Sequence, residues 1–372
     1  MPSRTDRRDA TTLAFATSNL AIEFIEGVKG DSIPENAFPP GDSTESIKLP
    51  KGIKGSWRSH MNALQHIVHK NLSTAVIFED DVDWDIHLTT QLRTFALASR
   101  LLSNQNFSTD LPHYNVQTSN NPETEESIHN NTSPNPISEN LYSLPLSRVP
   151  SLYPTPTLSP YGDPTKWDVL WLGHCGVGFP HAPTSPTTSP NSANILLTLQ
   201  NDTTVPSPKH LRAHPFGPLD ALATSHSPHT RVYHRATGGA LCTVAYAVSQ
   251  RGARRLLAEF GVRRWGRIWD AELGGWCAGS DLPTEPMKEN ESEESKKGRG
   301  REEPERVCLT VQPPIFAHHH PAGGESNIGG LGGGYARSVE TKYVRWSVRM
   351  NLDRLVSGYG NGEEGLVDQW PD

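Results

Sequence analysis

The sequence predicts an α/β fold with a mostly parallel sheet, interrupted by disordered insertions. Apolar runs of strand length at 74–80, 167–172 and 242–248 indicate buried strands. Segments with apolar residues at helical spacing lie between some of these runs. Strands that alternate with helices along a chain usually form a parallel sheet covered by helices on both faces. That is the architecture expected here.

The elements expected before the first large insertion are a short helix at 9–18, a strand at 22–25, a helix at 55–70, the strand at 74–80 and a partly helical stretch at 89–102. Residues 22–25 alternate in the manner of a half-buried strand. The helix at 55–70 has an apolar face whose members are spaced four, three and four residues apart: Trp57, Met61, Leu64 and Val68.

After the insertions, the strand at 242–248 leads directly into a second well-marked helix. Ser249 is a residue type that caps helix N-termini, and Gly261 is one that stops helices. A helix is therefore expected between these two positions.

Three stretches have a composition that favours surface insertions, at about 108–165, 181–230 and 281–305. The first two are rich in Ser, Thr, Pro and Asn, and the third is a charged run. Such segments bury too little apolar surface to offset the entropy lost on ordering. The remaining residues, roughly 230, suit one domain. We therefore expect a single domain over 1–350 and a C-terminal tail at 351–372.

Charge and hydropathy exclude two classes of protein. The formal net charge of −7 argues against a general nucleic-acid binder, which usually has a basic face. No apolar run approaches the roughly 18 residues of a membrane-spanning helix. The first eight residues lack the apolar core of a signal peptide.

The four cysteines lack any C-x-x-C pair, which argues against a zinc ribbon. Cys277 and Cys308 bracket the charged insertion, and this favours a bridge between its ends. Cys175 and Cys242 would then link two core strands. The alternative is four buried free thiols.

An acidic cluster, Glu79-Asp80-Asp81, follows the strand at 74–80 directly. Adjacent carboxylates resist ionising together unless a cation compensates them. Because ligands of open α/β sheets bind at the carboxyl ends of strands, the cluster indicates a hard divalent cation that holds a phosphate-bearing substrate. A solvated acidic turn is the alternative.

A helix carrying Ser59-His60, followed by a strand that ends in Glu-Asp-Asp, resembles glycosyltransferase family 25. This family includes lipooligosaccharide and collagen galactosyltransferases, and the chain is most similar to its fungal members. Further blocks resemble the family in the same order, and together they cover about half of the chain: the basic loop Arg4–Arg8, and residues 167–176, 237–257 and 312–323. The resemblance implies a nucleotide-sugar-binding domain of the GT-A type.

The chain also departs from this resemblance. Relatives normally carry a hydrophobic strand just before the basic loop, and many have a signal or anchor upstream, in keeping with the secretory pathway (Golgi or ER). Here the sequence starts in the loop, which suggests either a truncated gene model or a lost strand. Ser56 stands where relatives often have Cys.

The resemblance implies a metal-dependent inverting transfer of a hexose, galactose or glucose, from a UDP-sugar to a glycan or glycoprotein acceptor. Mn²⁺ or Mg²⁺ would stabilise the departing diphosphate as a Lewis acid. Asp81 is expected as the main metal ligand and Asp80 as a supporting one, with Glu79 nearer the ribose or sugar.

Other site residues are expected on the same basis. Arg4, Arg7 and Arg8 would contact phosphates, unless they form an exposed loop. The expected substrate-binding set is Arg4, Asp6, Arg7, Arg8, Ser59, His60 and Glu79, although His60 alone could be a core histidine. On an extended chain His318 and His320 share a face, so both are candidate metal ligands. The alternative is a packed His-rich turn.

Asp270 is the candidate general base for the acceptor hydroxyl, with Glu272 as its substitute. A helix-capping aspartate is the competing interpretation of Asp270. A divalent-metal hydrolase remains a second functional class, although H-x-x-E-H is absent and Asp85-Ile86-His87 is its one short D-x-H match. A catalytically silent relative that binds a carbohydrate or nucleotide sugar is the third.

Overall fold

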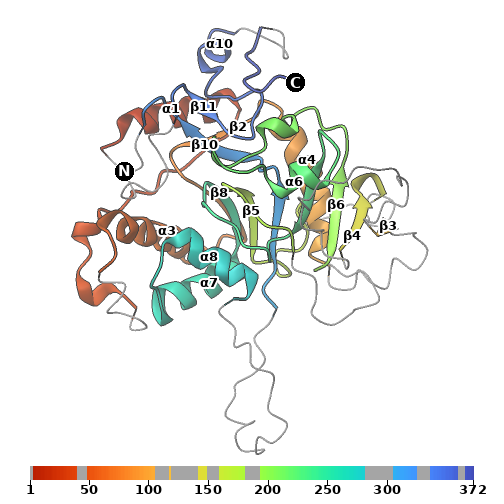
Figure 1. The fold of residues 1–372 in the computed structure, drawn as a ribbon. Helices are drawn as coiled ribbons and strands as arrows, with labels where there is room; N and C mark the ends of the chain where they lie inside the picture. The colour runs from red at the N-terminus through yellow and green to blue at the C-terminus, as the bar shows by residue number, and fades with distance from the viewer. Residues whose placement is uncertain are drawn as a thin grey trace, which may run out of the picture.

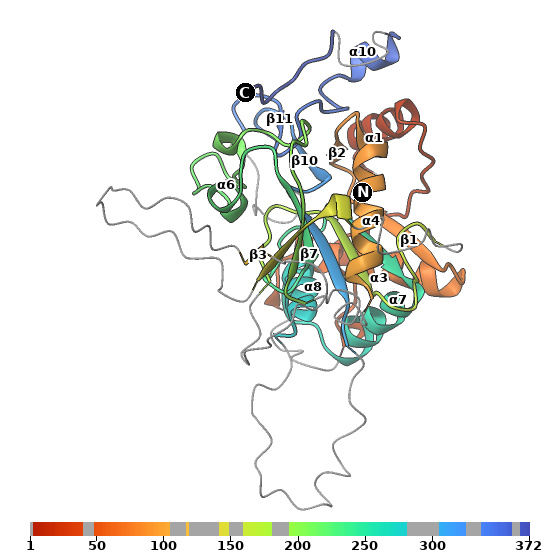
Figure 2. The ribbon, with the colours of Figure 1, turned by 90° about the vertical axis from the view of Figure 1, so that its right-hand side faces the viewer.

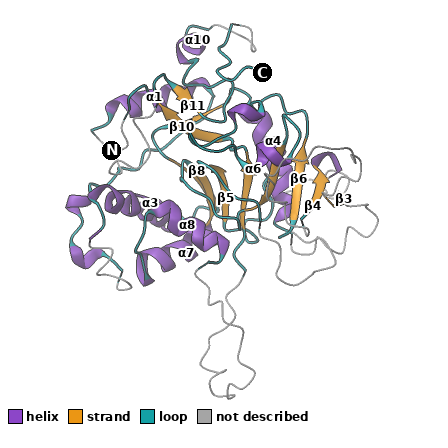
Figure 3. Cartoon of the chain, viewed as in Figure 1, coloured by secondary structure: helices purple, strands orange, loops and turns teal. Residues whose placement is uncertain are grey.

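The computed structural model describes residues 3–39, 48–104, 117–118, 141–148, 159–180, 193–280, 305–324, 336–358 and 365–372. It is a mixed α/β structure, with helices packed around a central sheet (Figures 1 and 3). The strands are β1 (Thr74–Phe78), β2 (Val82–Trp84), β3 (Gln117–Thr118), β4 (Tyr142–Pro145), β5 (Val169–Gly173), β6 (Ile195–Leu199), β7 (Arg231–Arg235), β8 (Ala245–Ser249), β9 (Cys308–Gln312), β10 (Phe316–His320) and β11 (Glu340–Thr341).

Helices cover both faces of the sheet. They are α1 (Thr5–Thr17), α3 (Lys51–His69), α4 (Leu88–Leu102), α6 (Ala221–Ser225), α7 (Gln250–Leu257), α8 (Trp269–Ala278) and α10 (Leu352–Val356). Short 3₁₀ turns cover Gly30–Ser32, Glu35–Ala37, Leu146–Arg148 and Pro208–His210, and a π-helical turn covers Ala258–Arg263.

The alternating side chains of β5 show how the two faces are filled. Leu170 and Leu172 pack into a core with α1 and α4. Val169 and Trp171 point the other way, into a core built with α3, α7 and α8. These three helices lie together on one side of the sheet (Figure 3). A strand buried on both faces is apolar throughout, which explains the continuous apolar run that predicted β5.

The sheet is mixed, and this corrects the expectation of a mostly parallel one. Its order is β1-β8-β5-β9-β7-β6-β4-β3, and β10 contacts β5 and pairs with β2 and β11. The labels of β2, β10 and β11 lie together in Figure 2. The pairs β5–β9, β4–β6 and β10–β5 are parallel. The remaining described pairs are antiparallel, including both neighbours of β8. The alternation of strands and helices did not predict the direction of each strand. β8 comes much later in the chain than β1 and β5, yet it lies between them in the sheet.

Three strands, β3, β4 and β6, lie inside stretches that the composition marked as insertions. Residues 193–230 are described and contribute β6, whose Ile195, Leu196 and Leu197 are buried. β4 pairs with β6 in register. The expectation of surface loops was therefore wrong at these positions. Each stretch is polar in its overall composition, and this hid the short apolar runs that form the strands. Residues 108–116, 119–140, 149–158, 181–192 and 281–304 lie outside the described residues.

Most predicted elements are confirmed within a few residues: α1, α3, β1, α4, β5, β8 and α7. Ser249 caps α7 as expected, since its Oγ accepts the N–H of Gly252 at 3.0 Å. Gly261 does not end the helix, which continues as the π-helical turn to Arg263. Residues 22–25 form no strand. The segment expected as a basic loop is instead the start of α1.

Both predicted disulfides, Cys175–Cys242 and Cys277–Cys308, are present. The first joins the segment after β5 to the segment before β8. The second ties the end of α8 to the start of β9, and both of its cysteines are buried.

The C-terminal residues pack onto the sheet end through buried polar contacts. The Asp83 carboxylate of β2 accepts hydrogen bonds from Thr341 Oγ1 at 2.6 Å, from Ser347 Oγ and from the N–H of Arg349. Further along, Arg345 pairs with Asp368. Residues 365–372, expected as part of a tail, therefore contact the domain.

Candidate active site

A cavity of about 1050 Å³ lies at the carboxyl end of β1. Its walls come from the start of α1, residues 21–31, one face of α3, β1 with the acidic turn at 79–81, and the end of β10. The carboxyl end of β1 was the position predicted for a ligand site, and a cluster of titratable side chains that lines the cavity gathers there.

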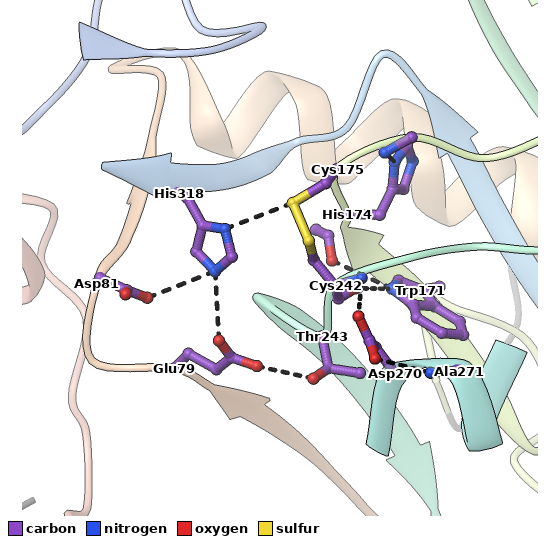
Figure 4. Close-up of a disulfide and its surroundings, with 12 residues drawn as sticks. Glu79, Asp81, Trp171, His174, Cys175, Cys242, Thr243, Asp270, Ala271 and His318 are labelled. Atoms are coloured by element: carbon purple, nitrogen blue, oxygen red, sulfur yellow. Dashed lines mark hydrogen bonds and ion pairs between the residues drawn. A yellow bond between two sulfur atoms is a disulfide. The ribbon is translucent and has the colours of Figure 1, made fainter. Parts of the chain in front are cut away.

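Glu79, Asp81 and His318 form this cluster (Figure 4). The His318 Nε2 atom is 3.3 Å from Glu79 Oε2 and 3.6 Å from Asp81 Oδ1. The acidic turn and β10 meet because β10 pairs with β2, which follows the turn immediately. Asp81 Oδ1 is buried and accepts no hydrogen bond within the described part of the chain.

Electrostatics favour the charged forms of His318 and Glu79. Burial alone would lower the pKa of His318, but the carboxylates of Asp81 and Glu79 outweigh it and raise the pKa to about 9. Burial likewise opposes ionisation of Glu79, yet hydrogen bonds and charge from His318 and His60 hold the pKa of that carboxyl well below its usual range. A proton on His318 thus supplies the positive charge that the two carboxylates require.

A divalent cation fits the same three side chains. Their ligand atoms lie within 4.8 Å of one another, and two carboxylates with one imidazole form a donor set that suits Mn²⁺. The buried Oδ1 atom of Asp81 accepts no hydrogen bond within the described residues. A buried oxygen in this condition is what one expects of an atom whose partner is a metal ion. The residues present therefore fit the metal implied by the acidic motif.

The predicted metal set is only partly brought together. Asp81 and His318 lie in the cluster, and Glu79 joins them. Asp80 instead directs its Oδ1 to Arg7 Nη1 at 2.9 Å. The His320 ring lies 5.8 Å from that of His318, outside the group of three. Burial, together with the positive charges of His318 and Lys342, lowers the pKa of His320 to about 4.

The expected phosphate-binding arginines line the cavity. Arg7 Nη1 is 2.9 Å from both Asp80 Oδ1 and Asp81 Oδ2. Arg4 pairs with Asp6 at 2.6 Å, and the Arg8 guanidinium stacks over Phe24, 4.7 Å from its ring centroid. Asp6 is exposed and does not line the cavity.

Ser59 and His60 support the site from α3. The Ser59 Oγ accepts the Val28 N–H at 2.9 Å and so holds the 21–31 segment against the helix. His60 is buried; its Nδ1 lies 2.8 Å from the Tyr246 hydroxyl and its Nε2 lies 3.7 Å from Glu79 Oε1. Both residues line the cavity, and His60 orients Glu79.

Asp270 also lines the cavity. It lies in the first turn of α8, where Ile268 occupies the N-cap position. Its Oδ2 accepts the Cys242 N–H at 3.0 Å, and its Oδ1 accepts the Ala271 N–H at 2.8 Å (Figure 4). These bonds fix the carboxylate between α8 and the segment that precedes β8.

Glu272 lies outside the cavity lining. It is buried, and its Oε1 accepts the N–H groups of Gly266 and Arg267, each at 3.0 Å. This carboxylate therefore holds the loop before α8, and the structure does not bring it to the site as a substitute for Asp270.

Two supporting residues were not anticipated. Thr243 donates its hydroxyl to Glu79 Oε1 at 2.7 Å. Arg349 donates from Nη2 to the Asp80 carbonyl at 3.0 Å and from Nε to the Val82 carbonyl at 2.7 Å. Thr243 lies within the strand predicted at 242–248, which was a usable signal. Arg349 lies some 270 residues from the turn, and no local pattern indicated it.

Residues 1–143 match the family model described as glycosyltransferase family 25 (LPS biosynthesis protein). No curated protein matches the sequence. The predicted resemblance is thus confirmed over these residues, which include α1, α3, β1 and the acidic turn. A sugar donor and an acceptor follow from that class. Within the described residues, no helix is long and apolar enough to cross a membrane.

Proposed function

We propose that this protein is a metal-dependent inverting glycosyltransferase with a GT-A-type domain. It moves a hexose, galactose or glucose, from a UDP-sugar to a glycan or glycoprotein acceptor. The observation that carries the proposal is the group Glu79, Asp81 and His318 at the carboxyl end of β1, which borders a cavity lined by three arginines.

Glu79, Asp81 and His318 would hold the cation, Mn²⁺ or Mg²⁺. When bound, the cation supplies Lewis-acid stabilisation of the diphosphate leaving group. Arg7, whose Nη1 faces the acidic turn from the cavity wall, and Arg4 and Arg8 add positive charge for the donor phosphates. His60 and Thr243 contact the Glu79 carboxylate and orient it.

Asp270 would take the proton of the acceptor hydroxyl. That oxygen attacks the anomeric carbon, and the bond to the diphosphate breaks with its electron pair on UDP, which inverts the configuration. Two backbone N–H groups hold the carboxylate in place before the reaction. Such fixed positioning is what efficient general-base catalysis requires.

The short motif that suggested a hydrolase has a structural role. Asp85 is buried; its Oδ1 lies 2.7 Å from His87 Nδ1, and its Oδ2 accepts the N–H of Trp346 at 3.1 Å. Asp85 therefore links β2 to the C-terminal segment and does not line the cavity, whereas the 79–81 turn does.

Binding of UDP-galactose and UDP-glucose, measured with and without Mn²⁺, tests the proposal. We expect metal-dependent binding, slow donor hydrolysis, and loss of both in Asp81→Asn with an unchanged circular dichroism spectrum. Metal-independent binding, or unaltered turnover of Asp81→Asn, would contradict the proposed site. Absence of nucleotide binding by the folded protein would favour a catalytically silent relative.

A further inference from the structure

The Cys175–Cys242 disulfide lies against the candidate active site (Figure 4). Both cysteines line the cavity and are partly exposed. In contrast, Cys277 and Cys308 are both buried and do not line it. A small reductant that enters the cavity therefore reaches the first disulfide and not the second.

His318 uses its two ring nitrogens on opposite sides. Its Nε2 faces the carboxylates of Glu79 and Asp81, whereas its Nδ1 lies 3.5 Å from the Sγ atom of Cys175 (Figure 4). The ligand atoms of Cys175, Cys242 and His318 all lie within 4.8 Å of one another. Sulfur atoms in a disulfide do not ligate metal ions as thiolates do, so this group acquires ligating ability only on reduction.

The distances suit zinc. Tetrahedral coordination with Zn–S of about 2.3 Å and Zn–N of about 2.0 Å places sulfur and nitrogen about 3.5 Å apart. This equals the observed separation of Cys175 Sγ and His318 Nδ1, 3.5 Å. The two sulfur atoms would separate to about 3.8 Å, which a change of side-chain rotamer in Cys242 can supply.

Hydrogen bonds fix the backbone around both cysteines independently of the disulfide. The Cys175 N–H donates to the Leu241 carbonyl at 2.9 Å. The Cys242 N–H donates to Asp270 at 3.0 Å, and its carbonyl accepts the Trp171 indole N–H at 3.0 Å. Cutting the sulfur–sulfur bond therefore leaves the two side chains facing each other and His318.

We propose that the reduced form of this protein binds a thiophilic divalent cation, Zn²⁺, through the thiolates of Cys175 and Cys242 and the Nδ1 atom of His318, with water in the fourth position. Two molecules of a thiol reductant supply two electrons and two protons, which convert the disulfide into two thiols, and are themselves oxidised to a disulfide. A phosphine supplies the two electrons, and water supplies the two protons and the oxygen of the phosphine oxide. Both thiol protons and the Nδ1 proton of the protonated His318 pass to solvent when the cation binds.

One consequence rests on the proposed function. A neutral imidazole has a single lone pair in the ring plane. When Nδ1 ligates Zn²⁺, Nε2 carries the hydrogen and points it at Glu79 and Asp81. The imidazole then no longer serves as a ligand of the cation that these carboxylates would hold, so the two sites exclude each other at His318.

Cobalt absorption spectroscopy without any sugar nucleotide tests this site separately from glycosyl transfer. Co²⁺ is added to the full chain before and after reduction with a phosphine. We expect one equivalent to give a thiolate-to-cobalt charge-transfer band and tetrahedral d–d bands after reduction only, and Zn²⁺ to displace it. Co²⁺ bound by Glu79, Asp81 and His318 gives no thiolate band.

Variants assign the ligands. Cys175→Ser and His318→Ala should lose the tetrahedral site, whereas the double variant Cys277→Ser/Cys308→Ser should retain it. Near-ultraviolet circular dichroism follows folding in each case. The proposal is overturned if the folded, reduced protein lacks the band, if Cys175→Ser or His318→Ala keeps it unchanged, or if reduction unfolds the domain.

Discussion

Asp270 and Glu272 are two residues apart in one helix, yet their carboxylates lie in different surroundings. Asp270 borders the cavity and accepts two backbone N–H groups. Glu272 is buried and accepts the backbone N–H groups of Gly266 and Arg267, in the loop before α8. Sequence alone allowed either residue to be the base, because it does not show which face of a helix points toward the ligand.

This difference predicts opposite effects of removing each charge. Asp270→Asn should reduce transfer to acceptor by roughly 10²-fold or more, the usual scale of positioned proton transfer. UDP-sugar affinity should stay within a few-fold, because the base acts only when the hydroxyl attacks. Initial rates and donor titration on the same preparation measure both quantities.

Glu272→Gln is the matched comparison. It should lower the thermal unfolding midpoint, because the bonds to Gly266 and Arg267 lose their charged acceptor. Its transfer rate, measured well below that midpoint, should remain close to that of the unchanged protein. Near-normal transfer by Asp270→Asn together with a large loss in Glu272→Gln would reverse the assignment.

At the scale of elements, the acidic turn depends on a residue from the other end of the chain. Arg349 donates to the carbonyls of Asp80 and Val82 and to the hydroxyl of Thr11. It therefore joins α1, the turn and the C-terminal segment at the point where Asp81 leaves the turn. Burial lowers the pKa of Arg349, against the opposing effect of nearby carboxylates such as Asp83.

Removing this support should weaken metal binding without touching the proposed ligands. Arg349→Met is expected to reduce Mn²⁺ affinity by about 10- to 100-fold, the scale seen for residues that orient metal ligands. Arg349→Lys, which keeps the charge but not the three-way geometry, should recover part of the loss. Calorimetric Mn²⁺ titration of both variants, with their unfolding midpoints, separates positioning from general instability. Unchanged Mn²⁺ affinity in a folded Arg349→Met variant would show that the turn holds its shape unaided.

The elements that the sequence predicted well are those with a strong local period or a clear boundary. The apolar face of α3 and the Ser249 cap of α7 are examples. β4 and β6 were missed because polar residues surround them, and sheet direction was misjudged because β8 enters between earlier strands. The acidic motif located the site, but Glu79 and not Asp80 meets His318, because the direction of each side chain in a turn depends on tertiary contacts such as Arg7 and Thr243.

At the scale of the whole molecule, two buried histidines outside the site make the stability of the fold depend on pH. His174 donates from Nε2 to the Val311 carbonyl and accepts the Gly176 N–H at Nδ1. His234 bonds the Arg235 carbonyl through Nδ1 and faces the Gln312 side-chain amide with Nε2. Each ring is therefore neutral, and burial lowers both pKa values from 6.5 to about 4.

These histidines predict acid destabilisation. Because their pKa values are lower in the folded state, the unfolded chain binds more protons between pH 6.5 and 4. Their contribution to stability is complete above about pH 6.5 and is lost as the pH falls toward 4. At about 1.4 kcal/mol for each pKa unit, each histidine contributes on the order of 3 kcal/mol. Urea unfolding between pH 7.5 and 4.5 should show this decline, and His234→Gln should make it shallower. An equally steep decline in that variant would place the pH dependence elsewhere.

The most direct measurement of the central claim is the Mn²⁺ affinity of matched variants in the presence of UDP. His318→Ala and Glu79→Gln should each lose Mn²⁺ binding, because both remove a ligand from the group with Asp81. His320→Ala and Asp80→Asn should retain it within a few-fold, although they are neighbours of equal chemical type. Loss of binding in His320→Ala or Asp80→Asn, with retention in His318→Ala or Glu79→Gln, would contradict the account.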